Sequence, residues 1–131
     1  MLLKLQRPVR NIRPARLRSC NNRPRIGVRV QLAGEGPVTS NPNDERYDEF
    51  PPHLQCVYLR ISGFTFRPTL GHLVIAEAPN KEAYYGDSGG GVVFNHQIYG
   101  VISARDESSP FRKPIYSMVV CEYMKWIRNT F

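Results

Sequence analysis

Short apolar runs separated by turn residues recur along this chain of 131 residues. Stretches rich in Val, Ile, Leu and Tyr are bounded by Gly, Pro, Asn or Asp, a pattern typical of strands joined by tight turns. The predicted strands are Met1–Gln6, Arg25–Ala33, Gln55–Ile61, His72–Glu77, Gly90–Asn95, Gln97–Ala104 and Pro114–Val119. Such short, regularly punctuated strands indicate an all-β barrel.

The period of the apolar residues changes near the C-terminus. Val120, Tyr123, Met124 and Ile127 recur at helical spacing, so a short amphipathic helix is expected from about Cys121 to Asn129. The stretch from Glu35 to Pro52 is rich in Pro, Asn and charge, and it is predicted to be a long surface loop.

The run Gly86-Asp87-Ser88-Gly89-Gly90 places a serine hydroxyl on a turn built from glycine. Glycines lack Cβ atoms, so a substrate carbonyl could approach the N–H groups of Gly86 and Ser88 closely enough for an oxyanion hole. The run resembles the nucleophile segment of the trypsin-like (chymotrypsin-fold) serine endopeptidases. Further segments resemble that family in order and spacing: Met1–Leu5, Gly34–Gly36, Leu54–Val57, Tyr99–Ser103, Pro114–Tyr116 and Cys121–Ile127.

The resemblance covers essentially the whole chain and implies a fold. It implies the second antiparallel Greek-key barrel of a double-barrel domain, followed by a C-terminal helix. Residues 1–6 would be the last strand of the first barrel and residues 7–24 the connector between barrels. Residues 25–120 would form the second barrel, and residues 121–131 the helix.

The resemblance also implies roles for the glycine-rich turn. Ser88 would attack the scissile carbonyl of a protein or peptide substrate, while the N–H groups of Gly86 and Ser88 hold the oxyanion. Asp87 would pair with the α-ammonium that zymogen cleavage releases. No cofactor is implied, and no set of metal-ligand residues has suitable spacing.

Substrate-binding residues follow from the same register. Glu82 would lie at the base of the primary specificity pocket and would favour Arg or Lys in the substrate, since a buried carboxylate needs a counter-charge. Arg105 would lie near the pocket mouth and could itself neutralise Glu82. Tyr85, Ser103 and Ala104 would also contact substrate.

The general base is the weakest point of the catalytic interpretation. The family orders its triad His, Asp, Ser, and this sequence begins just past the position of the aspartate. The three histidines His53, His72 and His96 are interpreted as loop or strand-end residues. The chain alone is therefore expected to be inactive. The alternatives are a non-catalytic binding module and a chain that assembles with a separate N-terminal half.

The resemblance further implies a disulfide between Cys20 and Cys121. Cys56, the third cysteine, would be left over as a reactive thiol or an intermolecular partner. A secreted or granule-stored protein is expected by resemblance. The apolar run at Met1–Leu5 is interrupted by Lys4 and is too short for a secretory signal, and no run reaches the roughly 18 residues of a membrane span.

The net charge of +7 is unevenly distributed. Nine of the 18 basic residues lie between Lys4 and Arg29, and no acidic residue precedes Glu35. A solvated connector is the preferred interpretation of this stretch, and a binding site for a polyanion is the alternative. Specific nucleic-acid recognition is not expected, because the stretch lacks aromatic residues for base stacking.

Overall fold

The structure is a computed structural model that describes residues 2–36, 50–79, 81, 83, 86–105 and 114–130. The side chains of Ala104 and Arg105 are not described. The predicted loop from Glu35 to Pro52 therefore lies mostly outside the described residues.

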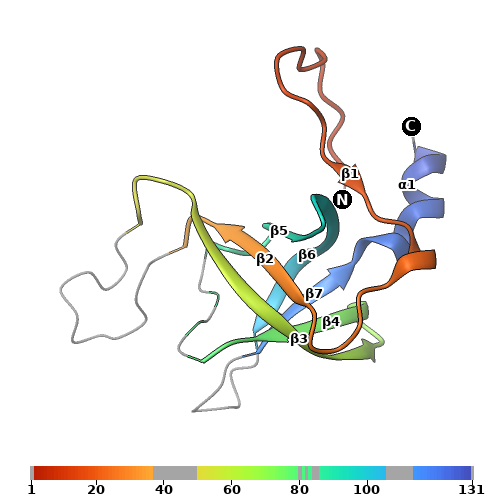
Figure 1. Cartoon of the computed structure of the whole chain (residues 1–131). Helices are drawn as coiled ribbons and strands as arrows, with labels where there is room; N and C mark the ends of the chain where they lie inside the picture. Colours follow the sequence, from red (N-terminus) through yellow and green to blue (C-terminus); the bar gives the residue numbers. More distant parts are fainter. Residues whose placement is uncertain are drawn as a thin grey trace.

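A closed antiparallel barrel of six strands forms the body of the molecule (Figure 1). The strands pair in the order β6-β5-β2-β3-β4-β7, and an additional β6–β7 pairing closes the barrel. The short helix α1 follows β7, so the predicted fold class is confirmed. The elements are β1 (Arg16–Leu17), η1 (Cys20–Asn22), β2 (Arg29–Gly34), β3 (Gln55–Arg67), β4 (Gly71–Glu77), β5 (Gly91–Phe94), β6 (Gln97–Arg105), β7 (Ile115–Val119), η2 (Val120–Tyr123) and α1 (Met124–Thr130).

Alternation along the strands builds the core. In β3, Leu59 and Ile61 are each 1% exposed, whereas the intervening Tyr58 and Arg60 face solvent. This period of two is what a half-buried strand requires. Strand β2 alternates in the same way, whereas β4 and β7 bury consecutive residues. The largest buried side chains of the core cluster are Tyr99, Leu32, Leu59, Ile61, Ile115, Val30, Val74, Val92 and Val119.

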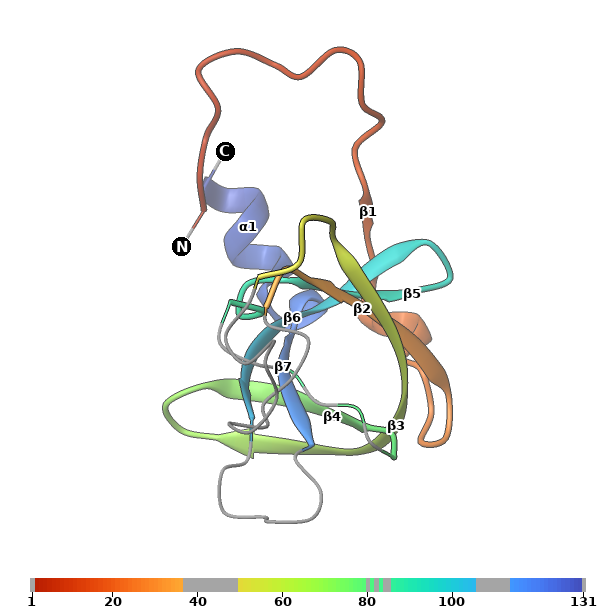
Figure 2. The same cartoon turned by 90° about the vertical axis from the view of Figure 1, so that its left-hand side faces the viewer.

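The N-terminal residues differ from the prediction. The strand predicted from Met1 to Gln6 is not formed, and residues 2–15 contain no strand. Instead they form an exposed arch that runs from beside α1 to β1 (Figure 2). A strand needs a neighbouring strand to satisfy its backbone groups, and none of the described strands lies beside this stretch. Only β1, at Arg16–Leu17, pairs with the barrel, in parallel with β6.

The hairpin β3–β4 is longer than predicted. β3 continues to Arg67 rather than ending at Ile61, because a register shift at Ile61/Gly63 lets the ladder with β4 proceed. Gly71 then takes a positive φ of 76° directly after the hairpin turn. A β-bulge of this kind adds a residue without ending the strand pairing.

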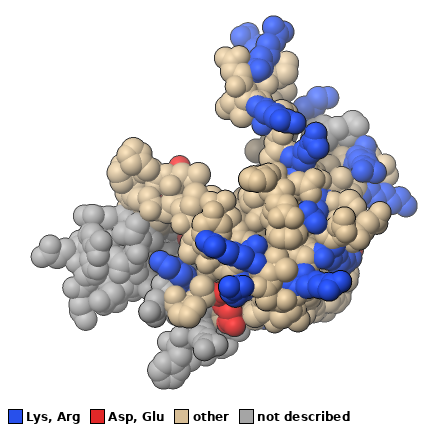
Figure 3. Space-filling model, in the orientation of Figure 1, with Lys and Arg blue, Asp and Glu red and all other residues tan. Residues whose placement is uncertain are grey.

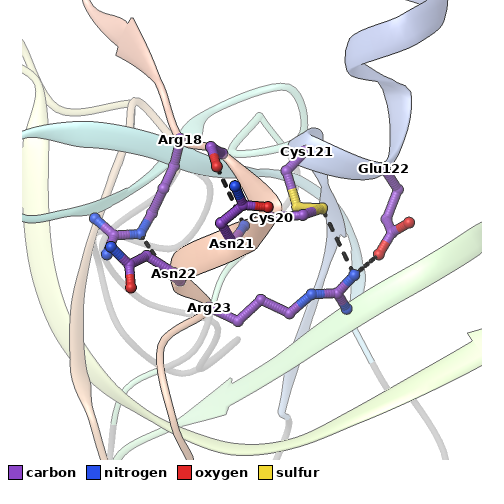
Figure 4. The surroundings of a disulfide bond; sticks show 8 residues. Arg18, Cys20, Asn21, Asn22, Arg23, Cys121 and Glu122 are labelled. Atoms are coloured by element: carbon purple, nitrogen blue, oxygen red, sulfur yellow. Dashed lines mark hydrogen bonds and ion pairs between the residues drawn. A yellow bond between two sulfur atoms is a disulfide. The ribbon is translucent and has the colours of Figure 1, made fainter.

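A disulfide joins the connector to the C-terminal segment. Cys20 and Cys121 are bonded across 101 residues of sequence, with their Cα atoms 5.2 Å apart. Figure 4 shows Arg23 reaching across this bond, where its guanidinium pairs with Glu122 and lies 3.6 Å from the sulfur of Cys20. The implied pairing is therefore present. Cys56 is exposed and free.

Candidate active site

Ser88 lies on a tight turn immediately before β5. The N–H of Gly90 donates to the carbonyl oxygen of Asp87 at 3.0 Å, which closes a four-residue β-turn. Gly89, the third residue, has φ of 89°. A positive φ at that position characterises a type II turn and favours glycine. Ser88 occupies the second position and is exposed.

Two backbone hydrogen bonds attach this turn to β6. The N–H of Gly89 donates to the carbonyl of Ile102 at 2.8 Å, and the N–H of Ile102 donates to the carbonyl of Gly90 at 2.9 Å. On its other side Gly90 lies against β2, since a Cβ atom there would stand 2.5 Å from the carbonyl oxygen of Ala33. The turn that carries Ser88 is thus held by strands on two sides.

The Asp87 side chain connects this turn to the end of β2. Its Oδ1 accepts a hydrogen bond from the N–H of Gly36 at 2.9 Å. A Cβ atom on Gly34 would stand 2.0 Å from the same oxygen, so the approach requires glycine. Asp87 has further interactions as well. Sequence reasoning missed this contact, although the paired glycines of Gly34-Glu35-Gly36 were a signal for it.

The N–H groups of Gly86 and Ser88 have no acceptor in the part of the chain that the structure describes. Gly86 has φ of 102°, and a Cβ atom there would lie 3.3 Å from the exposed ring of Phe50. An oxyanion hole needs such unoccupied backbone donors beside the nucleophile.

Strand β6 runs past the serine turn. Its pairing with β5 ends at Gly91 and Val101, whereas β6 itself continues to Arg105. A register shift between Ile102 and Ala104 leaves Ser103 out of the ladder with β7. Such bulges are frequent beside active sites, and an unpaired strand edge can accept an extended peptide.

No histidine assists Ser88. All three histidines lie among the described residues, and all are exposed. None of them hydrogen-bonds to the Ser88 hydroxyl. His96 lies in the β5–β6 turn with φ of 60°, at the opposite end of β5 from Ser88. His72 packs against the ring of Phe66, with centroids 5.0 Å apart.

Glu82 and Tyr85 lie outside the described residues, and the side chains of Ala104 and Arg105 do so as well. Their assigned roles stay predictions.

Metal ligands cluster once in the described ranges, at Cys20, Cys121 and Glu122. The two sulfur atoms are bonded to each other, so only the carboxylate, which already pairs with Arg23, remains as a ligand. None of the described helices is both long and apolar enough to span a bilayer.

Comparisons with known proteins agree with this arrangement. The family model described as Trypsin matches residues 1–127. Human Serine protease 1 is 30% identical over 139 residues, which covers 99% of this chain and 54% of the relative. The thrombin-like enzyme cerastocytin of Cerastes cerastes is 33% identical over 144 residues, covering 98% of this chain and 53% of the relative.

Solved structures show the same likeness. The mouse serine protease neuropsin superposes with a TM-score of 0.71 and 28% identity, covering 91% of this chain and 54% of that one. A scabies mite inactivated protease paralogue has a TM-score of 0.65, covers 89% of this chain and 52% of that one, and shares the fold at 22% identity. The chain spans about half the length of the curated relatives it matches.

Proposed function

We propose the function of this chain from one fact, that it belongs to the trypsin-like family of serine proteases. The chain carries the nucleophile half of a serine endopeptidase site. One observation carries this proposal: Ser88 is exposed on a turn held by β6, and the N–H groups of Gly86 and Ser88 have no acceptor among the described residues.

In this proposal Ser88 Oγ attacks the carbonyl carbon of the scissile peptide bond. The carbonyl oxygen gains negative charge as the tetrahedral intermediate forms, and the N–H groups of Gly86 and Ser88 donate hydrogen bonds to it. The backbone of Ser103, which has no ladder partner in the described parts of β5 and β7, receives the extended substrate chain. Glu82, Tyr85, Ala104 and Arg105 line the substrate side, with Glu82 and Arg105 setting the preference for the residue before the cut.

The proton of Ser88 needs an acceptor that the described residues do not provide. A serine hydroxyl without a base is a weak nucleophile. Loss of triad members lowers turnover by about 10⁶-fold in such enzymes, with roughly 10³–10⁴ over water left from the oxyanion hole and binding. We therefore infer that the 131-residue chain by itself is inactive towards peptides.

The missing groups belong, in this proposal, to the half of the relatives' length that this chain does not match. In the same proposal residues 25–120 correspond to the second barrel, residues 7–24 to the connector and residues 121–131 to the C-terminal helical segment. Residues 1–6 would form a strand only by pairing with the other half. Exposed apolar side chains near the N-terminus, such as Leu3 at 77% and Leu5 at 65% exposure, support a partner surface there.

Asp87 is the proposed switch of the oxyanion hole. Its carboxylate already accepts the N–H of Gly36, and pairing with an α-ammonium would add a cation to this site. The disulfide is typical of proteins that fold in an oxidising compartment. One of the relatives is named as a snake venom serine protease, and venom is a secretion. We infer that the natural protein is secreted or stored in granules.

Labelling with a fluorophosphonate probe tests the proposal. The chain alone, shown to be folded by its near-UV circular dichroism, is expected to label no more than a Ser88→Ala variant. Addition of the N-terminal half of a matched relative, expressed separately, is expected to bring labelling at Ser88, while Ser103→Ala labels normally. Labelling of the chain alone at Ser88 would contradict the predicted inactivity. A reconstituted complex that labels elsewhere or not at all would sink the assignment of Ser88.

A further inference from the structure

The exposed arch of residues 2–15 and the adjoining β1 carry a regular charge pattern that the proposed protease function does not use. Basic residues recur at every third position, at Lys4, Arg7, Arg10, Arg13 and Arg16. We call these five residues the basic ladder. All five are exposed, and no acidic residue occurs before Glu35.

A period of three has a physical meaning in a proline-containing segment. An extended polyproline-type chain has three residues per turn and a rise of about 3.1 Å per residue, so residues three apart project from the same edge. Pro8 and Pro14 lie between the rungs and favour that conformation. The arch has bends at Gln6–Arg7 and Asn11–Ile12, so its edge is curved in the structure.

The charges on the ladder are not neutralised within the described part of the chain. None of its members has an ion-pair partner there. Arg23, by contrast, is paired with Glu122. Figure 3 shows Lys and Arg side chains along the arch, beside α1 and over the barrel on the same face, with little acidic surface between them.

The barrel end of the ladder is fixed in position. Arg16 belongs to β1, which pairs with β6. Two residues on, Arg18 donates to the carbonyl of Asn22 at 2.7 Å and to the side chain of Gln97 at 3.0 Å, and its guanidinium lies 4.6 Å from the Phe94 ring centroid. All three partners are neutral, so the guanidinium keeps its positive charge while its geometry is held.

Two further cations, Arg29 and Arg60, lie on the barrel strands β2 and β3. Arg29 and Arg60 are direct neighbours across β2 and β3, an arrangement that like charges disfavour. Arg29 lies 3.7 Å from the Tyr58 ring centroid and Arg60 donates to the carbonyl of Gly27 at 2.9 Å. Glu77 is the neighbour of Arg60 on β4. An acidic residue therefore lies beside Arg60, whereas Arg29 lies against the neutral Tyr58 ring.

We propose that the basic ladder, together with Arg18 and Arg29, binds a sulfated polysaccharide. Guanidinium groups bind sulfate and carboxylate oxygens through paired hydrogen bonds, and a linear polyanion can meet successive rungs. The disulfide fits the extracellular compartment where such polymers occur, whereas the strongly anionic membrane leaflet faces the cytoplasm. Residues 2–24 contain no aromatic side chain for base stacking.

The test measures binding of a heparin oligosaccharide of defined length to the full chain by calorimetry, together with the salt concentration that elutes the chain from heparin-agarose. The ladder variant Arg7→Gln, Arg10→Gln, Arg13→Gln, Arg16→Gln alters exposed side chains only. We expect it to bind about a hundredfold more weakly, since an exposed ion pair contributes roughly threefold. The matched control Arg46→Gln, Lys81→Gln, Arg112→Gln, Lys113→Gln removes the same charge outside the ladder, and it is expected to lose far less affinity.

A composition-matched variant tests the spacing itself. Exchanging Arg10 with Asn11 and Ile12 with Arg13 keeps the net charge but moves two rungs off the common edge, and about tenfold weaker binding is expected from two lost pairs. If this variant bound heparin with full affinity, the proposal would be overturned. An equal loss of heparin affinity in the matched control would overturn it as well. Tighter binding to duplex DNA or to phosphatidylserine vesicles than to heparin would assign the surface to another polyanion. Ser88→Ala is expected to bind like the unmodified chain, which separates this test from that of the protease site.

Discussion

At the scale of single residues, Tyr99 places a hydroxyl in the barrel interior without a hydrogen-bond partner among the described residues. Its side chain is 0% exposed. Burial raises the pKa of Tyr99, with the Glu122 carboxylate adding to the rise and the cations Arg23 and Arg18 opposing it. A buried hydroxyl without a partner reduces stability relative to an apolar atom.

Tyr99→Phe is therefore expected to raise the free energy of unfolding by about 1 kcal/mol at neutral pH. The gain should widen at alkaline pH. The unfolded tyrosine ionises near its usual pKa of 10.0 while the folded one stays protonated, so the unmodified chain loses stability as the pH rises from there towards the folded pKa. Urea unfolding at neutral pH and above pH 10 would measure both effects. Lower stability of the variant at neutral pH would mean that the hydroxyl has a partner.

Between elements, Asp87 joins the Ser88 turn to residues 34–36 at the end of β2. The carboxylate of Asp87 fills the space that side chains on Gly34 and Gly36 would take. Asp87 and Gly36 are 51 residues apart in sequence. A substitution in one of these segments is therefore expected to change the stability of the other.

Gly34→Ala is expected to lower the free energy of unfolding by about 1–3 kcal/mol, because the new Cβ overlaps Asp87. Gly63→Ala is the matched control on β3, where a Cβ would make an ordinary 3.6 Å contact with Ile75, and its expected change is under about 0.5 kcal/mol. In an Asp87→Ala background, Gly34→Ala should cost less, as chemical denaturation of all four proteins can show. The same cost in both backgrounds would refute the coupling.

Across the whole molecule, one covalent link opposes opening of the barrel. The bond between Cys20 and Cys121 closes 101 residues of sequence and so encloses every barrel strand. Such a link restricts the unfolded chain strongly.

Replacement of both Cys20 and Cys121 by Ser is expected to lower the free energy of unfolding by about 3–5 kcal/mol, as loop-closure entropy for roughly 100 residues implies. Cys56→Ser changes an exposed thiol, so its stability should stay within about 0.5 kcal/mol of the parent. Thermal unfolding under non-reducing conditions would compare the three proteins. An unchanged double variant would show that the barrel does not depend on its disulfide.

Local patterns predicted most of the fold because strand alternation is a local property. β4, β5, β6 and β7 lie within one residue of their predicted bounds. β2 begins at Arg29 rather than Arg25, and α1 begins at Met124 rather than Cys121, after the 3₁₀ turn η2.

The prediction of a strand at Met1–Gln6 was wrong. A strand forms only beside another strand, and the local sequence does not show whether such a neighbour is present. β3 extends beyond its predicted end because the register shift between Ile61 and Gly63 lets its pairing with β4 continue.

For the site, sequence identified the serine turn but not what fixes it. The glycines of Gly86–Gly90 indicated a turn, and resemblance supplied the role of Ser88. The hydrogen bond from Gly36 to Asp87, the attachment to Ile102 and the bulge at Ser103 are tertiary features. Each depends on strands that meet only after folding.

The disulfide has a topological consequence for how the chain can be cut. Residues 20–121 form a covalent ring, with Ser88 and its turn inside it and the basic ladder on a tail outside it. A single cleavage within the ring would leave the two pieces joined until reduction. A single cleavage between two rungs of the ladder, by contrast, would separate those rungs from the ring and leave the serine turn intact. One cut would therefore have different consequences for the serine turn and for the basic ladder.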